Sequence, residues 1–461
     1  MNPPRPQDCT AGRAVVVGLG RTGAAAARFL LARGMSVAIT DSRTDPPGRA
    51  LLTDRIGQLT VRTGGFDAAL LDGAALVVLS PGVAPVGQFF DAVRSHGIAL
   101  LGDIELFARA VSAPVVGITG TNGKSTVTTL LAQMAQRCAL RVRAGGNLGV
   151  PALELLAPAV QLYVLELSSF QLESTESLAL VAAAVLNVSA DHLDRYPDVA
   201  GYAAAKARIF AHAEVAVINL DDPRVVAMPP AGLPRLSFSV NPAADCGADF
   251  HLSVLSGRGP GRGTGAAEPW LMRRGEPLLA LAQLQIHGRH NAANALAALA
   301  LAEALALPRE PCLAALREFT GLPHRMHRVA EIRGVRYIDD SKGTNVSATL
   351  AAVAGLAAPL ILIAGGEGKG QDFQPLRAAF AGKVRCALLI GRDARALGAA
   401  LAGTCECVYC GTLEQAVQRA AGLARAGETV LLSPACASLD MFRDYAHRGE
   451  VFAAAVAGLA A

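Results

Sequence analysis

Residues 114–126 read PVVGITGTNGKST, a β-branched run that enters a glycine-rich turn and continues into a helix-forming segment. Glycines in such a turn let backbone N–H groups point at phosphate oxygens, and the positive end of a following helix favours the same anion. We expect Lys124 to reach the β- and γ-phosphates of a nucleotide, and Ser125 or Thr126 to hold Mg²⁺. This stretch therefore predicts a strand, a phosphate-binding loop and a helix.

The match to the strict phosphate-loop pattern is incomplete. Ile118 stands where the first glycine of that pattern is expected, and the glycines lie instead at positions 117 and 120. A glycine-rich strand-to-helix turn that binds nothing is the alternative. The position of Gly123-Lys124-Ser125-Thr126 between a predicted strand and a predicted helix favours phosphate binding.

Composition limits the classes of function to consider. The 461 residues suggest two to four domains, and a hydrophobic content of 52% is enough for several cores. A scattered net charge of +4 does not indicate nucleic-acid binding, and without an apolar run of about 18 residues we expect no membrane span. Residues 1–13 show no signal-peptide core, and nine cysteines in so long a chain suit a reducing cytoplasm.

Residues 14–41 predict a strand, a glycine turn, a helix and a second strand that ends at Asp41. The turn reads Gly18-Leu19-Gly20-Arg21-Thr22-Gly23, and with the acid about 20 residues further on it fits the dinucleotide-binding pattern. A second loop, Ser80-Pro81-Gly82, follows a predicted strand at 76–79. Two such loops suit a nucleotide-sized ligand, and ordinary turns between strands and helices are the alternative.

Strands and helices alternate along the remaining chain, so the predicted fold class is α/β with mostly parallel sheets. A central unit is predicted to have strands at 114–119, 162–167, 182–188 and 215–220, followed by a small antiparallel insertion at 236–287. A third unit after Gly321 is predicted to have a final helix over 450–461 and strands at Val335–Asp339, Leu360–Ala364, Cys386–Ile390, Glu406–Tyr409 and Thr429–Leu432.

Two polar groups stand near predicted strand ends of the central unit. Glu166 lies where active groups of parallel sheets gather, and a carboxylate beside a phosphate loop is a natural Mg²⁺ ligand. The alternative for Glu166 is an ion pair with a nearby base. His192 follows another strand and could bind a metal or orient a ligand, although a lone histidine is more often structural.

Lys206 lies on the apolar face of a helix predicted over 202–211. It shares that face with Tyr202, Ile209 and Phe210, because these residues are spaced at helical intervals. A buried lysine is costly unless it is neutral, paired or modified, and a carbamate formed with CO₂ would turn this cation into an anion able to bind Mg²⁺. The alternative is a lysine whose amine extends to the surface.

Amides and hydroxyls mark further candidate loops. Asn291 and Asn294 stand in the first turn of a long Ala/Leu helix, where they could hydrogen-bond a purine edge or only cap the helix. Three loops of the third unit follow strands and should gather at one edge of its sheet, where their lysines and hydroxyls suit an anionic substrate; they lie at 339–345, 365–369 and 433–438.

Three cysteines, Cys405, Cys407 and Cys410, have a spacing that suggests a metal site. No second Cys/His cluster accompanies them, so we favour a structural role in a strand.

These motifs together resemble those of the Mur ligases of peptidoglycan synthesis, over essentially the whole chain after residue 12. The stretch at 120–129 is similar to the one that marks ATP-dependent Mur ligases in general. The other specific stretches resemble the member that adds D-glutamate, and they lie at 163–173, 322–325, 340–345 and 431–440.

The resemblance implies three domains. Residues 1–102 would form a Rossmann-like domain for a UDP-linked substrate, residues 103–321 an ATP-binding domain, and residues 322–461 a Rossmann-like domain for glutamate. The UDP end would contact Thr22, Asp41, Ser42, Ser80, Pro81, Gly82 and Asn147.

The resemblance also implies the ATP, metal and glutamate contacts. ATP would contact Gly120, Thr121, Asn122, Gly123, Lys124, Ser125, Thr126, Asn291, Asn294, Arg325 and Asp340, with Lys342 close to the phosphates. One Mg²⁺ would bind Ser125 and Glu166, and a second would bind His192 and a carbamylated Lys206. The incoming glutamate would contact Thr344, Lys369, Ser438 and Tyr445.

Five positions depart from the family pattern without removing a catalytic group. Arg21 replaces a residue that is commonly aliphatic, Met326-His327 replaces Phe-Glu, Glu367 replaces an aspartate, and Tyr445 replaces a phenylalanine of the glutamate pocket. These changes concern the fine shape of the glutamate site.

The activity implied by the resemblance is ATP-dependent amide-bond formation. UDP-N-acetylmuramoyl-L-alanine and D-glutamate would be joined through an acyl phosphate by a cytoplasmic, monomeric enzyme whose catalytic groups are Lys124, Glu166, His192, Lys206 and Lys342. The alternatives are a folylpolyglutamate-synthase-like ligase, a Mur ligase for another amino acid, an NAD-dependent dehydrogenase built on the 18–23 turn, and a nucleotide-binding regulator without activity.

Overall fold

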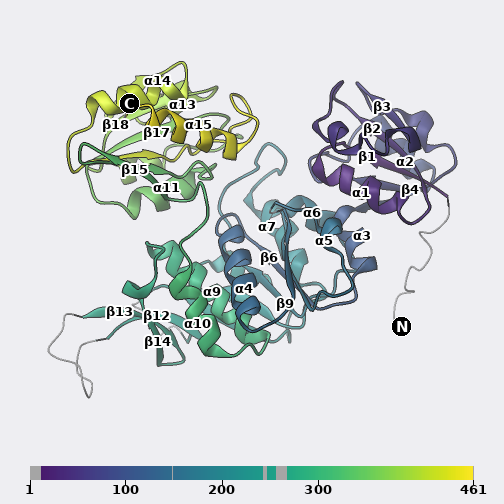
Figure 1. Ribbon diagram of the computed structural model, residues 1–461, viewed down its shortest axis with the longest axis horizontal. Coiled ribbons are helices and arrows are strands. Elements are labelled where there is room, and N and C mark those ends of the chain that lie inside the picture. The colour runs from purple at the N-terminus through teal and green to yellow at the C-terminus, as the bar shows by residue number, and fades with distance from the viewer. Residues whose placement is uncertain (1–11, 148, 242–246, 256–266, 460–461) are drawn as a thin grey trace. The chain divides into compact units, whose positions relative to one another are not determined.

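The computed structural model describes residues 12–147, 149–241, 247–255 and 267–459. The chain divides into two compact units, of which the first comprises residues 1–187, 203–279 and 294–316, and the second residues 188–202, 280–293 and 317–461. Strands and helices gather around three separate sheets, which run in Figure 1 from purple through teal and green to yellow. The predicted α/β class is confirmed.

The first sheet is wholly parallel, with strand order β3-β2-β1-β4-β5. Its strands are β1 (Arg13–Val17), β2 (Ser36–Asp41), β3 (Leu59–Thr63), β4 (Ala74–Leu79) and β5 (Ala99–Gly102). The chain order reverses between β1 and β4, and a crevice for a ligand forms at such a switch point in open α/β sheets. The two loops predicted to bind a nucleotide follow these two strands.

The second sheet has nine strands in the order β14-β13-β12-β11-β10-β9-β6-β8-β7. They are β6 (Val115–Thr119), β7 (Val142–Gly146), β8 (Leu162–Glu166), β9 (Ala182–Val185), β10 (Ala216–Asn219), β11 (Arg235–Ser239), β12 (Phe250–Leu255), β13 (Glu268–Arg273) and β14 (Glu276–Ala280). The antiparallel insertion predicted at 236–287 is only partly correct. β11 and β12 continue the parallel sheet, and the antiparallel pairing that the described residues show begins between β12 and β13.

The third sheet has the order β15-β16-β20-β17-β18-β19. Its strands are β15 (His327–Ile332), β16 (Val335–Asp339), β17 (Leu360–Gly365), β18 (Val384–Ile390), β19 (Glu406–Tyr409) and β20 (Thr429–Leu432). Five of these match the predicted strands closely, whereas β15, which pairs antiparallel with β16, was not predicted. Its burial is only partial and its sequence carries His327, Arg328 and Glu331, so no apolar run reveals it.

The helices alternate with the strands. They are α1 (Arg21–Leu31), α2 (Gln88–Ser95), α3 (Asp103–Ala110), α4 (Lys124–Arg137), α5 (Ala152–Leu155), α6 (Ser169–Glu173), α7 (Val199–Ala207), α8 (Pro223–Val226), α9 (Arg289–Ala304), α10 (Arg309–Glu318), α11 (Val346–Ala354), α12 (Leu376–Phe380), α13 (Ala394–Ala400), α14 (Leu413–Leu423) and α15 (Tyr445–Ala457). The final helix begins earlier than predicted, because the side chain of Asp444 caps it by accepting from the His447 amide. No helix in the described part of the chain is long and apolar enough to cross a membrane.

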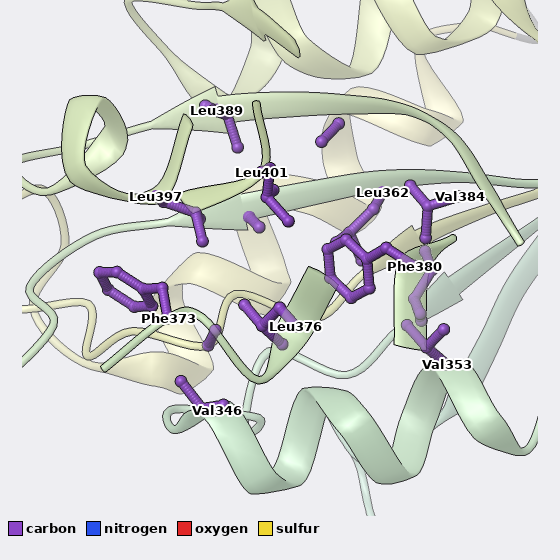
Figure 2. Packing of buried hydrophobic residues seen from close by; sticks show 14 of the residues in the cluster. Val346, Val353, Leu362, Phe373, Leu376, Phe380, Val384, Leu389, Leu397 and Leu401 are labelled. Carbon is purple, nitrogen blue, oxygen red and sulfur yellow. The ribbon is translucent and has the colours of Figure 1, made fainter. Parts of the chain in front are cut away.

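Apolar side chains of β17 alternate between two buried clusters, as the two-residue period of a strand requires. Leu362 points into a cluster covered by α11, α12 and α13, where Phe380 and Leu376 lie between the helices and the strands (Figure 2). Ile361 and Ile363 point to the opposite face, where α14 and α15 provide the cover. Because helices cover both faces of the sheet, its central strands can carry apolar side chains on both faces.

Replacement of Phe380 by alanine should lower the free energy of unfolding by about 3–5 kcal/mol, because it leaves a cavity in a fully buried cluster. Urea unfolding followed by circular dichroism measures the change. Leu439→Ala, at a side chain that is 68% exposed, is the matched control and should change stability by less than about 0.5 kcal/mol. Equal effects for the two variants would contradict the described packing.

Candidate functional site

The phosphate loop between β6 and α4 is built around two glycines with left-handed backbone angles. Gly120 has φ +149° and Gly123, the residue before α4, has φ +86°. A Cβ atom built on Gly123 would lie 2.4 Å from Oδ1 of Asn294. The backbone angle favours glycine at 123, and a Cβ there would also force the side-chain amide of Asn294 to move.

Asn187 holds the phosphate loop through hydrogen bonds to Thr121 and Asn122. Its backbone oxygen accepts from the amide of Thr121 at 2.9 Å, and its side-chain oxygen accepts from the amide of Asn122 at 2.8 Å. Its side-chain nitrogen in turn donates to the carbonyl of Asn122 at 3.0 Å. Sequence reasoning did not single out Asn187, which lies two residues after β9 and bonds to a loop far from it in the sequence.

The two lysines of this site both reach the backbone of the loop. Nζ of Lys124 donates to the carbonyls of Gly120 at 2.9 Å and Thr121 at 2.8 Å. Nζ of Lys206 donates to the carbonyl of Gly120 at 2.9 Å and contacts Oγ1 of Thr119 at 3.4 Å. Lys206 is only 1% exposed, so the alternative of an amine that extends to the surface is wrong.

Glu166 ends β8 and is 2% exposed. Its Oε1 accepts from the side-chain amide of Asn147 at 2.7 Å, and its backbone oxygen accepts from the Asn147 amide at 2.8 Å. Asn147, predicted to contact a diphosphate, thus lies directly on the carboxylate predicted to bind Mg²⁺. Ser125, in the first turn of α4, is also buried.

The predicted metal ligands are divided between the two compact units. Ser125, Glu166 and Lys206 belong to the first unit and His192 belongs to the second. Within the described residues no group of three or more His, Cys, Asp or Glu side chains could hold a metal. Mg²⁺ usually takes several of its ligands from phosphate oxygens and water. The ligand set remains a prediction.

In the first sheet, Asp41 organises the turn after β1. Its Oδ2 accepts from the Leu19 amide at 2.6 Å and from the Arg43 guanidinium at 2.7 Å. Burial raises the pKa of Asp41, but the hydrogen bonds from Arg43 and from the Leu19 amide outweigh this and hold it below its ordinary value. Asp41 thus lies at the predicted turn, and its carboxylate already has protein partners.

The second loop of this sheet contacts the first. Oγ of Ser80 donates to the carbonyl of Gly18 at 2.7 Å, and a Cβ on Gly23 would lie 1.9 Å from the same oxygen. The remaining residues predicted here belong to the same loops: Thr22 and Pro81 are half-buried, and Ser42 and Gly82 are exposed. The two loops are brought together as predicted, whereas their ligand remains a prediction.

In the second unit, the three loops gather at one edge of the sheet, which confirms the prediction made for them. Ser433 donates to Oδ2 of Asp340 at 2.8 Å. The amide of Ala435 donates to the carbonyl of Gly343 at 2.9 Å, and Glu367 and Ala437 exchange backbone hydrogen bonds. The candidate residues Thr344, Lys369 and Ser438 all lie on these loops.

Arg448, on α15, holds the first of these loops and was missed by sequence reasoning. It is fully buried, and its guanidinium donates to the carbonyl of Ser341 at 2.7 Å, to Oγ of Ser341 at 3.0 Å and to the carbonyl of Cys436 at 3.1 Å. Burial lowers its pKa to about 10, so it stays charged at neutral pH. The adjacent Lys342 places its amine 3.6 Å from the ring centroid of Tyr445, a cation–π contact.

Asp191 joins the segment that carries His192 to the loops at 339–345 and 365–369. It forms an ion pair with Lys369 and accepts from the side-chain amide of Asn345 at 3.1 Å. Burial raises its pKa, but the charges of Lys369 and His192 outweigh this and hold it below its ordinary value. His192 and Lys369 have φ values of +55° and +53°, a strained conformation that proteins often keep at functional loops.

Two residues of the predicted ATP contacts have other roles in addition. The side-chain nitrogen of Asn291 donates to the carbonyl of His287 at 2.9 Å, which is not the helix cap of the alternative, because a capping side chain accepts from a backbone N–H. The charge of Arg325 acts on Asp340, whose Oδ1 also accepts from the Met326 amide at 3.3 Å. Cys405, Cys407 and Cys410 lie within or directly beside β19, in the strand setting that we favoured.

The pKa of Asp340 should make stability depend on pH. Burial raises this pKa from 3.8 to about 7, although the Ser433 hydroxyl and Arg325 lower it. The folded protein therefore holds the proton more tightly than the unfolded chain. The stabilisation is complete below pH 4 and is lost as the pH rises to 7, by at most roughly 4 kcal/mol.

Asp340→Asn carries no titrating group at this position and can still contact Ser433. The stability of the unsubstituted protein relative to Asp340→Asn should fall between pH 4 and pH 7, as measured by urea unfolding at each pH. A difference that is constant over this range would show that Asp340 is ionised throughout.

Comparison with known proteins gives a consistent family assignment for each part of the chain. Family models match residues 12–102 as "Mur ligase MurD-like, N-terminal domain", residues 118–302 as "Mur ligase middle domain" and residues 324–436 as "Mur ligase, glutamate ligase domain". The chain is 50% identical over 458 residues to a UDP-N-acetylmuramoylalanine–D-glutamate ligase of Nitrosococcus oceani, covering 98% of each chain. It is 48% identical to the ligase of the same name of Methylobacillus flagellatus, covering 96% of each.

Solved structures share the fold at lower identity. The chain is similar to UDP-N-acetylmuramate-alanine ligase MurC of Thermotoga maritima with a TM-score of 0.63, 16% identity, and coverage of 97% of this chain and 100% of that one. The MurF ligase of the same organism, solved in complex with ADP, gives a TM-score of 0.59 with 16% identity, and the match covers 92% of this chain and 96% of that one.

Proposed function

This chain belongs to the Mur ligase family, and from that premise we propose that it joins D-glutamate to UDP-N-acetylmuramoyl-L-alanine at the expense of ATP. The observation that carries the proposal is the 50% identity to a ligase of that name over 98% of each chain. The phosphate loop, with two lysines on its backbone, provides a setting for ATP. The loop cluster of the second unit provides cations for a dicarboxylate.

The chemistry proceeds in two transfers. The alanyl carboxylate attacks the γ-phosphorus of ATP, and ADP leaves with the electron pair of the broken P–O bond. The amine of D-glutamate then attacks the carbonyl carbon of the acyl phosphate, loses a proton, and expels inorganic phosphate from the tetrahedral intermediate. Negative charge spreads over phosphate oxygens in the first step, so Lys124 and the loop amides are the groups that stabilise it.

The residues around the phosphate loop fit Mg²⁺. Glu166 and Ser125 offer the hard oxygen donors that this ion prefers, and Lys206 would offer them as a carbamate. We assign one ion to Ser125 and Glu166 and a second to His192 and carbamylated Lys206. When bound, the ions supply positive charge that neutralises the phosphates.

Carbamylation of Lys206 accounts for the burial of a long cationic side chain. At 1% exposure an unmodified ammonium pays the full desolvation cost of its charge, and this amine lies against the carbonyl of Gly120 and the hydroxyl of Thr119. The ammonium first loses a proton, and the neutral amine then forms an N–C bond with CO₂ while one C–O π electron pair moves to oxygen; loss of a second proton from nitrogen leaves the carbamate anion. That anion can both accept hydrogen bonds and bind a cation.

We assign the remaining parts of the substrates to residues of the other loops. We assign uracil and ribose to Asp41, Ser42, Ser80, Pro81 and Gly82, and the diphosphate to Thr22 and Asn147. ATP also contacts Asn291, Asn294, Arg325 and Asp340, with Lys342 near the phosphates. D-Glutamate is held by Thr344, Lys369, Ser438 and Tyr445. We place the domain boundaries after residues 102 and 321, and we propose a monomer located in the cytoplasm.

Phosphate release tests the reaction. The purified protein should release phosphate from ATP in the presence of Mg²⁺, UDP-N-acetylmuramoyl-L-alanine and D-glutamate, with a product heavier by one glutamyl residue in mass spectrometry. L-Glutamate, L-lysine and meso-diaminopimelate, added one at a time, are the matched controls and should give none. Release with one of these instead would assign the chain to another step of the same family.

Lys206→Ala should lower turnover by at least about 100-fold, because a metal ligand is lost. Added bicarbonate should not restore it, since alanine cannot form a carbamate. Circular dichroism confirms that the variant is folded. Near-normal turnover of the folded variant would refute the role of Lys206.

A further inference from the structure

Asp103 is the first residue of α3, directly after the last strand of the first sheet. It is 2% exposed, and its Oδ2 accepts from Nε2 of Gln171 at 3.0 Å. Its Oδ1 is buried without a hydrogen-bond partner among the described residues. Burial raises the pKa of Asp103 to about 6. The ionised carboxylate, which is the main form at neutral pH, is therefore less favourable here than in water. A buried group of this kind requires an explanation.

Gln171 links Asp103 to the turn that follows Glu166. The side-chain oxygen of Gln171 accepts from the amide of Ser168 at 3.1 Å and from the Ser168 hydroxyl at 3.2 Å. The backbone amide of Gln171 donates to the same hydroxyl, which completes a capping box at the start of α6. Ser168 is two residues after Glu166, so this box fixes the backbone that carries the carboxylate.

The orientation of the Gln171 side-chain amide depends on Asp103. The oxygen and nitrogen of a glutamine amide are nearly equal in size, and only hydrogen bonding distinguishes the two orientations. An ionised carboxylate can only accept, so Asp103 selects the orientation with the nitrogen toward itself. The oxygen is then directed at Ser168, and the capping box forms.

Other contacts hold α3 against the same region. The Gly102 amide donates to the carbonyl of Ser174 at 3.2 Å. Oε2 of Glu105 accepts from the amides of Glu176 at 2.8 Å and Ser177 at 2.9 Å. These bonds secure α3 without any contribution from Asp103. The Asp103–Gln171 bond is therefore not needed merely to attach the helix.

We propose that Asp103 is a positioning residue, which acts through Gln171 and Ser168 to hold the Glu166 carboxylate in place for Mg²⁺–nucleotide. The proposal rests on the assignment of Glu166 as a metal ligand. Partners of metal ligands commonly matter to metal affinity almost as much as the ligands do. Asp103 is linked to Glu166 indirectly, through the side chain of Gln171 and the backbone of Ser168, two residues after Glu166.

Asp103→Asn tests the proposal, because asparagine has the same shape but no longer dictates the orientation of Gln171. Calorimetric titration of the full-length protein with ADP should show affinity about tenfold weaker in the presence of Mg²⁺, and unchanged affinity in EDTA. Turnover should fall with a raised Mg²⁺ requirement, while the KM for D-glutamate stays constant. Gln171→Met cannot accept from Ser168 and should show the same selective loss.

The double variant Asp103→Asn with Gln171→Glu is the decisive rescue. The new amide at position 103 can donate to one oxygen of the new carboxylate at position 171, and the other oxygen can accept from Ser168. Mg²⁺-dependent affinity should then return to within about threefold of the unsubstituted protein, because the two changes are strongly coupled. Glu105→Gln is the matched control on the same helix and should lower thermal stability without changing the Mg²⁺ dependence.

A double variant no better than Asp103→Asn would overturn the proposal, and so would single variants with normal Mg²⁺ dependence. The binding experiments require no product formation. Failure of the unsubstituted protein to ligate D-glutamate would therefore refute the proposed function separately, while the Mg²⁺-dependent titrations would still decide the role of Asp103.

Discussion

Gly123 has a left-handed backbone angle that a residue with a side chain adopts only with strain, and this constraint shapes the loop between β6 and α4. The left-handed angle favours glycine there, and the absence of a Cβ leaves room for the side-chain amide of Asn294. The loop can consequently lie close to α9, and Asn187 can hold two of its amides from the other side. Backbone donors fixed in this way need no reorganisation when charge develops on a phosphate.

Fixed loops also explain where the chain tolerates buried cations. Lys206 and Arg448 are both almost fully buried, and both donate to backbone carbonyls of loops that end parallel strands. Arg448 satisfies three acceptors with its planar guanidinium, which makes it suited to a permanent structural charge. A lysine amine has fewer hydrogen-bond donors than a guanidinium, and it can be chemically modified. Arg448 is therefore suited to a permanent structural charge, and Lys206 to a modified group.

The sequence was sufficient for the strands whose residues are apolar on both faces and for the loops that follow them. β17, β18 and β20, which are buried along almost their whole length, lie within two residues of their predicted bounds, and Lys206 is buried as its helical spacing indicated. Partly exposed or short strands such as β15, β3 and β7 carry no such signal. Asn187 and Arg448 were missed because their importance comes from hydrogen bonds to distant backbone, which local pattern does not reveal.

The pairing of Lys369 with Asp191 bears on how a dicarboxylate could be bound. The side chain of Lys369 is long and flexible, and holding its amine in one position costs conformational entropy. Asp191 already holds the Lys369 amine in one position, so part of this entropy is lost on folding and not on substrate binding. A substrate carboxylate would then share an amine that is already oriented. The same aspartate precedes His192, so the position of the histidine backbone and that of the amine depend on one carboxylate.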